Sequence, residues 1–266
     1  MILTIKYFKM NRFFTLLACA LTMTLTSCQF SENIYINEDG SGRMEFSMDA
    51  SEMMEMVGQM GEGNSENGMD KAVDSTIVFK DFLEEKKDSI ATLPIEDQQK
   101  IKALEDFKMH MVMNPETKKM VFDLNTEFKD ANELQDMFKA MNSFSNLQGT
   151  GGAEQNTPSS PFSNIGEGGS TDVQYSFDGH VFKRSAKIVD QELHQQAMDS
   201  LGEQSAMMFG SSKYKINYHF PRAVKSFSKE GAMYSEDRKT VTFEVGFMDV
   251  LKDPELLDFE VVLEDK

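Results

Sequence analysis

The sequence predicts an α+β protein, in which antiparallel sheets built from hairpins carry helices packed on one face. Segments that alternate apolar and polar residues come in pairs joined by short Gly- or Pro-containing turns, which is typical of β-hairpins. Between these pairs, apolar residues recur three and four positions apart, which is typical of amphipathic helices. Because nearly every predicted strand is apolar on one side only, we expect a sheet with one face under helices and the other in water.

The first predicted hairpin covers residues 31–48. Ile34 and Ile36 alternate with polar residues before the turn, and Met44 and Phe46 do so after it. The turn itself reads Asp-Gly-Ser-Gly, and its glycines tolerate the positive φ angles that tight hairpin turns require. This segment therefore predicts a two-stranded unit with one apolar face.

Helical spacing predicts six helices, at residues 49–57, 79–90, 94–104, 130–141, 188–209 and 247–256. Asp49 and Asp130 are each followed three residues later by a glutamate, Glu52 and Glu133, which is the spacing of an N-cap and its N3 partner. Pro94 stands at the start of its segment, where the missing N–H of proline does no harm. For the helix at 94–104 we expect a buried side made of Ile95, Ile101 and Leu104.

Two further hairpins are predicted at residues 107–124 and 173–186, the second around the Asp178-Gly179 turn. Single strands at residues 214–220, 241–245 and 257–263 complete the set. We expect the polar residues of the first two single strands and their flanks on the water-facing side of the sheet: Lys213, Lys215, Asn217, His219, Thr240, Thr242 and Glu244.

Four segments divide the chain. We expect a signal peptide at residues 1–27, an α+β domain or subdomain at 28–143, a flexible linker or loop at 144–170 and a second α+β half at 171–266. The third segment is rich in Gly, Asn, Ser and Pro and contains few large apolar residues. It therefore buries too little surface to offset the entropy cost of ordering its backbone.

Composition limits the partners and the compartment. The 266 residues include 44 acidic and 27 basic side chains, which gives a net charge of −17. Such a surface repels phosphate groups, so nucleic acid is excluded as a partner. The two cysteines, Cys19 and Cys28, both lie in or next to the predicted signal peptide. The folded part must therefore form without a disulfide.

The sequence contains no motif for catalysis or metal binding. His110, His180, His194 and His219 are scattered and none belongs to a His-Glu-x-x-His pattern. No Gly-x-Ser-x-Gly elbow marks a nucleophilic serine. Residues 37–40 resemble part of a calcium loop, but the ligand positions around them do not fit, so a turn is predicted there. We expect no metal, no cofactor and no catalytic residue.

The N-terminus has the pattern of a secretory signal. Lys6, Lys9 and Arg12 precede an uncharged apolar run at residues 13–25, and small residues and Cys28 follow it. The run is shorter than the roughly 20 residues that a membrane-spanning helix needs. We therefore expect export and cleavage close to this cysteine.

The tetrapeptide Leu25-Thr26-Ser27-Cys28 resembles the lipobox of bacterial lipoproteins. The resemblance implies that the Cys28 sulfur receives a diacylglyceryl group and that the chain is cut directly before this residue. The next residue is Gln29, whereas many Gram-negative lipoproteins retained at the inner membrane have aspartate there, so the resemblance implies the outer membrane. The alternative is an ordinary signal peptide cut nearby, which would leave Cys28 as a free thiol.

The Asp-Gly-Ser-Gly turn after Ile36 also resembles the hairpins of uncharacterised envelope lipoproteins with an LppM-like α+β domain. We expect a lipid-anchored cell-envelope protein without enzymatic activity, which binds or assembles with an envelope protein partner. The alternative is a carrier that holds a lipid or another apolar ligand in a cleft lined by Met and Phe between sheet and helices. A hydrolase would require His110 or His219 in a pocket with a buried carboxylate.

Overall fold

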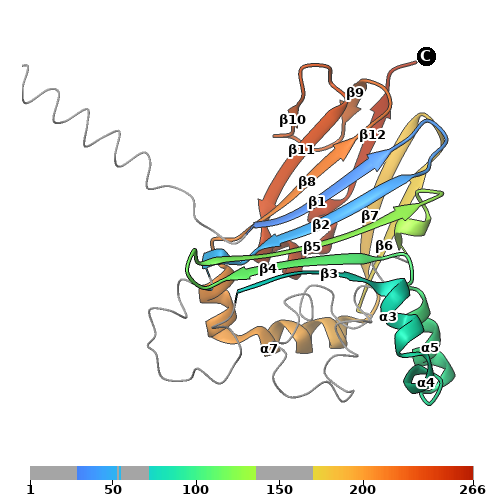
Figure 1. Cartoon of the computed structure of the whole chain (residues 1–266). Helices are drawn as coiled ribbons and strands as arrows, with labels where there is room; N and C mark the ends of the chain where they lie inside the picture. The colour runs from blue at the N-terminus through green and yellow to red at the C-terminus, as the bar shows by residue number, and fades with distance from the viewer. Residues whose placement is uncertain (1–28, 53, 55–71, 136–169, 266) are drawn as a thin grey trace, which may run out of the picture.

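The structure, a computed structural model, describes residues 29–52, 54, 72–135 and 170–265. These residues form an α+β fold with two mostly antiparallel sheets, which confirms the predicted fold class (Figure 1). The predicted signal peptide, Cys28, and all of the expected linker or loop at 144–170 except residue 170 lie outside the described residues.

The larger sheet has eight strands in the order β10-β11-β8-β1-β2-β5-β4-β3. Their bounds are β1 Gln29–Ile36, β2 Gly42–Asp49, β3 Val73–Val78, β4 Lys108–Asn114, β5 Lys119–Phe128, β8 Lys213–His219, β10 Met233–Tyr234 and β11 Thr240–Gly246. Every neighbouring pair is antiparallel except β1 and β8, which are parallel. A parallel pair needs a long crossover, and here the chain from β1 to β8 passes through both sheets before it returns.

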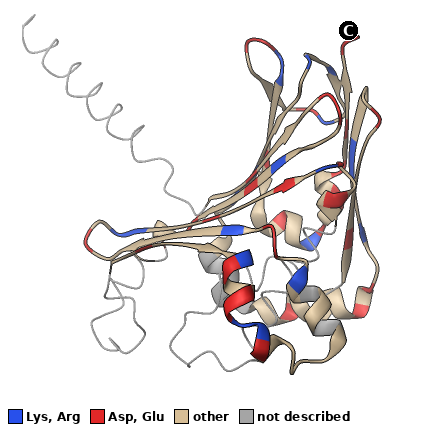
Figure 2. Cartoon of the chain, turned by 45° about the vertical axis from the view of Figure 1, so that its right-hand side comes forward, with Lys and Arg blue, Asp and Glu red and all other residues tan. Residues whose placement is uncertain are grey.

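The smaller sheet has four strands in the order β6-β7-β12-β9, with bounds β6 Thr171–Phe177, β7 Val181–Ile188, β9 Val224–Phe227 and β12 Phe259–Leu263. It packs on the apolar face of the larger sheet, where the sequence led us to expect helices alone. The Phe182 ring lies edge-to-face with Tyr218, with centroids 5.5 Å apart, and Phe227 lies 5.8 Å from Phe243. Figure 2 shows the two sheets side by side with helical segments between them.

Five α-helices and one 3-10 helix are described: α3 Phe79–Glu85, α4 Lys87–Ile90, α5 Ile95–Lys102, α7 Gln191–Phe209, α8 Phe247–Lys252 and η3 Pro254–Leu257. Helix α7 begins three residues later than predicted, because the side chain of Asp190 caps it and accepts a hydrogen bond from the Leu193 N–H at 2.9 Å. The predicted helix at 247–256 is divided at Pro254, since α8 ends before this residue and η3 begins there.

The helices α3, α4 and α5 form a protrusion between β3 and β4. Of the side expected to be buried at 94–104, Leu104 is buried and Ile101 is half-buried, but the prediction is wrong for Ile95. Ile95 is 74% exposed and Phe82 41% exposed, whereas Phe79 is buried. These short helices extend beyond the sheet, and their apolar residues outside the core, such as Ile90 and Ile95, line an open groove of about 700 Å³.

Two predicted helices lie only partly within the described residues. After Asp49, the N–H of Ser51 donates to the Asp49 carboxylate at 3.0 Å, and the helix that begins there leaves the described region. At the second, Glu133 accepts from the Lys129 N–H at 2.8 Å, and Asp130 accepts from the Asn132 N–H at 2.8 Å. At both starts the predicted aspartate thus accepts a backbone N–H, and at the second start the predicted N3 glutamate also accepts one, from Lys129.

The core fills the space between the sheets and continues across both halves of the chain. Strands from residues 28–143 and from 171–266 share the larger sheet, with β1 and β8 in direct contact. The predicted hairpins at 31–48, 107–124 and 173–186 are confirmed. Their inward methionines are core residues: Met44, Met48, Met113 and Met120 are buried. Most of the described methionines on these strands therefore serve as packing.

Candidate binding groove on the outer face of the large sheet

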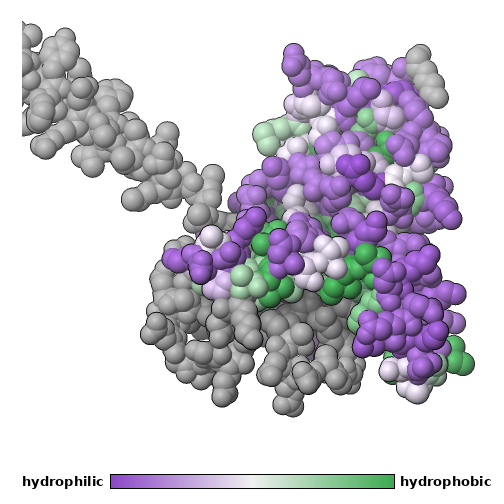
Figure 3. Space-filling model, in the orientation of Figure 1, coloured by the Kyte–Doolittle hydropathy of each residue, from purple (hydrophilic) through white to green (hydrophobic). Residues whose placement is uncertain are grey.

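The outer face of the larger sheet is the face that points away from the smaller sheet. All seven residues expected on the water-facing side, from Lys213 to Glu244, lie on it, because Tyr214, Ile216 and Tyr218 between them are buried. Figure 3 shows a mostly hydrophilic surface over the upper strands and hydrophobic surface along the lower ones, β3 to β5. The half-buried residues Val112 and Val121, which pair in register, contribute apolar atoms to this lower part.

Three side chains stack across β8, β1 and β2 near the end of β1. The His219 ring lies parallel to the Tyr35 ring, with centroids 4.1 Å apart and an interplanar angle of 3°. The Arg43 guanidinium lies 3.8 Å from the centroid of the same tyrosine ring. Partial burial lowers the pKa of His219, and the positive charge of Arg43 lowers it further. The three side chains thus form a preformed stack on the outer face.

A ladder of amide and hydroxyl groups runs beside this stack. The Thr242 hydroxyl donates to Asn217 at 2.9 Å, and the Asn217 amide donates to Asn33 at 3.0 Å and to Ser31 at 3.3 Å. These side chains are half-buried and satisfy one another across three strands. The ladder fixes their rotamers and gives this part of the face a rigid polar surface.

A groove of about 1050 Å³ opens on the outer face where β1 ends and β2 begins. We call it the outer groove. Its floor is made of outward side chains of β1, β2 and β5, namely Tyr35, Arg43, Glu45, Asn125 and Glu127. Lys80, Glu105 and Lys108 line its wall toward α3 and β4.

The lining of the outer groove is strongly polar and carries both signs of charge. Arg43 and Glu45 form an ion pair at 3.0 Å. Within the described part of the chain, no ion pair or side-chain hydrogen bond engages Lys80, Lys108 or Glu127. Pockets for small apolar ligands are lined mainly by hydrophobic side chains, so this groove suits a polar, charged surface instead.

A second polar cluster crosses β2, β5, β4 and β3 on the same face. His110 Nε2 lies 2.9 Å from Asp74 and its Nδ1 lies 3.7 Å from Asp123. Ser47 donates its hydrogen bond to Asp123 and thus does not face the histidine. The hydrogen bond to Asp74 raises the pKa of His110. The Ser47 hydroxyl is bonded to Asp123 and not to His110, so the cluster does not have the geometry of a hydrolase triad.

The other two histidines lie elsewhere in the fold. His180 Nδ1 is 3.8 Å from Asp265 at the C-terminal end, and His194 is buried with Nε2 3.2 Å from the Lys252 carbonyl. Among the described residues, no group of three or more His, Cys, Asp or Glu side chains is placed to hold a metal ion.

A buried polar cluster, which we did not predict, links the two sheets. Glu32 on β1 accepts hydrogen bonds from the hydroxyls of Tyr214 at 2.5 Å, Tyr175 at 3.3 Å and Tyr218. Arg184 on β7 donates to the Tyr175 hydroxyl at 3.2 Å. Burial raises the pKa of each of these tyrosines, and the neighbouring Glu32 raises it further. The cluster lies inside the core and not in the outer groove.

The buried cluster could have been predicted from the alternation of inward and outward residues along β1 and β7. Glu32 stands in register with Phe30, Ile34 and Ile36 on the apolar side of β1, and Arg184 stands between Phe182 and Ala186 on the apolar side of β7. A charged residue at an inward position requires a partner inside the core. Two such positions of opposite charge in one sequence therefore indicate a buried network.

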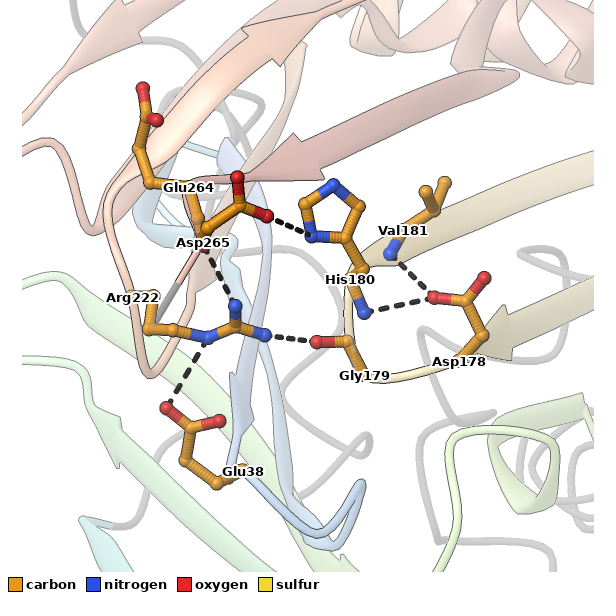
Figure 4. A network of polar contacts seen from close by, with 8 residues as sticks. All are labelled: Glu38, Asp178, Gly179, His180, Val181, Arg222, Glu264 and Asp265. Carbon is orange, nitrogen blue, oxygen red and sulfur yellow. Dashed lines mark hydrogen bonds and ion pairs between the residues drawn. The ribbon is translucent and has the colours of Figure 1, made fainter.

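Arg222 connects several turns at one end of the two sheets (Figure 4). The β1–β2 turn lies at this end. The Arg222 guanidinium donates to the carbonyls of Glu264, at 2.7 Å, and Gly179, and its Nε lies 3.3 Å from the Glu38 carboxylate. Beside it, the backbone N–H groups of Val181 and His180 donate to Asp178 and lower its pKa. Arg222 thus links the β1–β2 turn, the β6–β7 turn and the chain after β12.

None of the described helices is long and apolar enough to span a bilayer. No protein-family model matches the chain, and no curated protein matches it. Among solved structures, the folded domain of LppM from Mycobacterium tuberculosis, determined by NMR, aligns over 91% of this chain and 95% of its own. The identity is 9% and the TM-score 0.37, which is too low to transfer a family or a function.

Proposed function

We propose that this protein is a lipid-anchored protein of the bacterial cell envelope, which binds a protein partner through the outer groove and has no enzymatic activity. The observation that carries the proposal is the Leu25-Thr26-Ser27-Cys28 tetrapeptide after a short apolar run, directly before the first strand at Gln29. The export signal and the acylated residue would thus end where the folded domain begins. The outer membrane is the proposed location, because glutamine follows the cysteine.

The chemistry of the anchor supports a permanent attachment. Each acyl CH₂ that enters the bilayer contributes about 0.8 kcal/mol, so one chain binds reversibly and two or three chains hold firmly. A diacylglyceryl thioether on Cys28 would supply two chains. The domain would therefore remain at the membrane surface without a spanning helix.

The outer groove supports a protein partner over the alternative of an apolar carrier. It exposes Lys80, Lys108 and Glu127 without described partners, and such charges select complementary polar surfaces and reject others. Neither this groove nor the one among α3–α5 lies in the cleft between sheet and helices that a carrier would require. The inward methionines of β2 and β5, such as Met44 and Met120, are buried in the continuous core and do not line such a cleft.

The anchor is tested by metabolic labelling with a fatty-acid probe. Cys28→Ala should abolish labelling and leave precursor or released protein. Cys19→Ala, which removes the other cysteine of the chain, is the matched control and should keep full labelling. Unchanged labelling of the Cys28→Ala protein would rule out the anchor.

The groove is tested by photo-crosslinking in intact cells. A photoreactive residue at Glu127, in the floor of the groove, should form a discrete adduct with one partner. The same residue at Lys183, on the exposed side of the smaller sheet, is the control and should not. Lys108→Glu should remove the adduct at Glu127, since it reverses a groove charge. Adducts that are equal at both sites, or unaffected by the charge reversal, would contradict the proposal.

A further inference from the structure

Strand β1 leaves no spacer between the proposed lipid anchor and the folded core. Gln29, the residue bonded to Cys28, is already paired with Asp49 on β2 and with Lys213 on β8. Phe30 is 1% exposed and stacks on Phe247, with ring centroids 3.8 Å apart. Consecutive Cα atoms are about 3.8 Å apart, so the acylated residue would lie within two residues of the fixed core.

We propose that this direct junction orients the domain on the bilayer, with the Gln29 end of the larger sheet against the lipid headgroups and the outer groove facing away. The inference rests on the proposed lipid anchor at Cys28. An anchor on a long flexible linker would let the domain tumble, whereas an anchor next to a paired strand residue transmits its position to the whole sheet.

Strand register shows which residues share the membrane end. β1 and β8 both begin there, while β2 and β4 end there and β5 begins there, so the β4–β5 turn with Glu116 belongs to this end. The opposite end carries the β1–β2 turn, the β10–β11 turn with Glu236, and the outer groove. The eight residues of β1 span about 23 Å, which sets the height of the groove above the headgroups.

Both ends of the larger sheet carry mixed charge. The end remote from Gln29 carries Glu38, Asp178, Glu264 and Asp265 around Arg222 (Figure 4). At the membrane end, Lys118, Lys119 and Lys213 lie among Asp49 and Glu116. Figure 2 shows both signs of charge at the tip of the long hairpin on the left, which is the β4–β5 turn. The remote end also carries Lys80 and Lys108 in the outer groove and Lys239 in the β10–β11 turn, so the orientation rests on the direct junction and not on charge.

Two turn glutamates provide a matched pair of labelling sites. Glu116 and Glu236 are both exposed and lie at opposite ends of the sheet. The acylated protein has no free thiol, since Cys19 is removed with the signal and the Cys28 sulfur is blocked. Glu116→Cys or Glu236→Cys therefore gives a single site for a fluorophore. The full lipidated protein is placed in phosphatidylethanolamine–phosphatidylglycerol vesicles that contain a fluorescent acceptor lipid.

We expect energy transfer to the acceptor lipid at least threefold greater from position 116 than from position 236. Equal transfer, or greater transfer from position 236, would overturn the orientation. A 20-residue Gly-Ser insertion between Cys28 and Gln29 should abolish the difference, and a difference that persists would contradict the role of the direct junction. Intact mass confirms acylation beforehand, so a missing anchor, which would refute the proposed function, is distinguished from a wrong orientation.

Discussion

The carboxylate of Glu32 on β1 accepts a hydrogen bond from the Tyr175 hydroxyl on β6, 3.3 Å away, and so joins the two sheets inside the core. Arg184 donates to the same hydroxyl and to the Leu257 carbonyl at 3.1 Å. Burial works against the charged guanidinium, but Tyr175 and Glu32 outweigh it and raise the pKa of Arg184. The stability of the sheet pair therefore depends on the acid that balances this cation.

Glu32→Gln should lower the free energy of unfolding by about 3 kcal/mol, because it leaves the buried Arg184 without its counter-charge. Urea unfolding monitored by circular dichroism measures the loss. The double variant Glu32→Leu/Arg184→Met removes both charges and should lose less than Glu32→Gln alone. If the double variant loses as much free energy of unfolding as the single variants Glu32→Leu and Arg184→Met lose in sum, the two residues do not act as a pair.

Arg222→Lys should lower the free energy of unfolding by about 2 kcal/mol, because a lysine cannot reach the Gly179 and Glu264 carbonyls and the Glu38 carboxylate together. Amide hydrogen exchange should increase in the β6–β7 turn, which the guanidinium holds. Lys183→Ala is the control, since its 2.7 Å ion pair with Glu260 lies in solvent and contributes little. Unchanged exchange in the turn of the Arg222 variant would contradict the proposed tie.

Gly42→Ala should cost at least about 3 kcal/mol of stability, since the first residue of β2 has no room for a side chain. A Cβ there would lie 1.9 Å from the Tyr35 carbonyl oxygen and 2.5 Å from the Phe128 ring. Gly231→Ala is the matched control. Gly231 has a φ of +83° but no atom within 4 Å, so only the backbone strain of about 1 kcal/mol applies. Equal losses of thermal stability would show that close packing at Gly42 is not the cause.

Local patterns in the sequence predicted the hairpins but not all of the strands. The segment Val73–Val78 reads V-D-S-T-I-V, in which three polar residues in a row hide the alternation, and only its pairing with β4 makes it a strand. Strands β9 and β10 are four and two residues long, too short for a periodic signal. The parallel pairing of β1 with β8 depends on tertiary contacts that no local window contains.

The candidate site was less predictable than the fold. The outer groove combines β1, β2, β5 and the segment before β4, which lie far apart in the sequence and share no motif. Its side chains, such as Glu45 and Asn125, look like ordinary solvent-facing residues of strands. By contrast, the water-facing residues of β8 and β11 were predicted correctly, because strict alternation assigns them to one face.

The His110 pair with Asp74 should make the edge strand β3 sensitive to pH. The hydrogen bond to Asp74 raises the pKa of His110 above the value of about 6.5 expected in an unfolded chain. The native state therefore binds the proton more tightly, and this stabilisation is fully present below about pH 6.5 and is lost as the pH rises through the native pKa.

Asp74→Asn should lower the pKa of His110 and flatten this pH dependence. NMR titration of the imidazole measures the shift, with His219, whose pKa is lowered, as the internal control. If Asp74→Asn leaves the His110 titration unchanged, Asp123 or another group, and not Asp74, raises the pKa of His110.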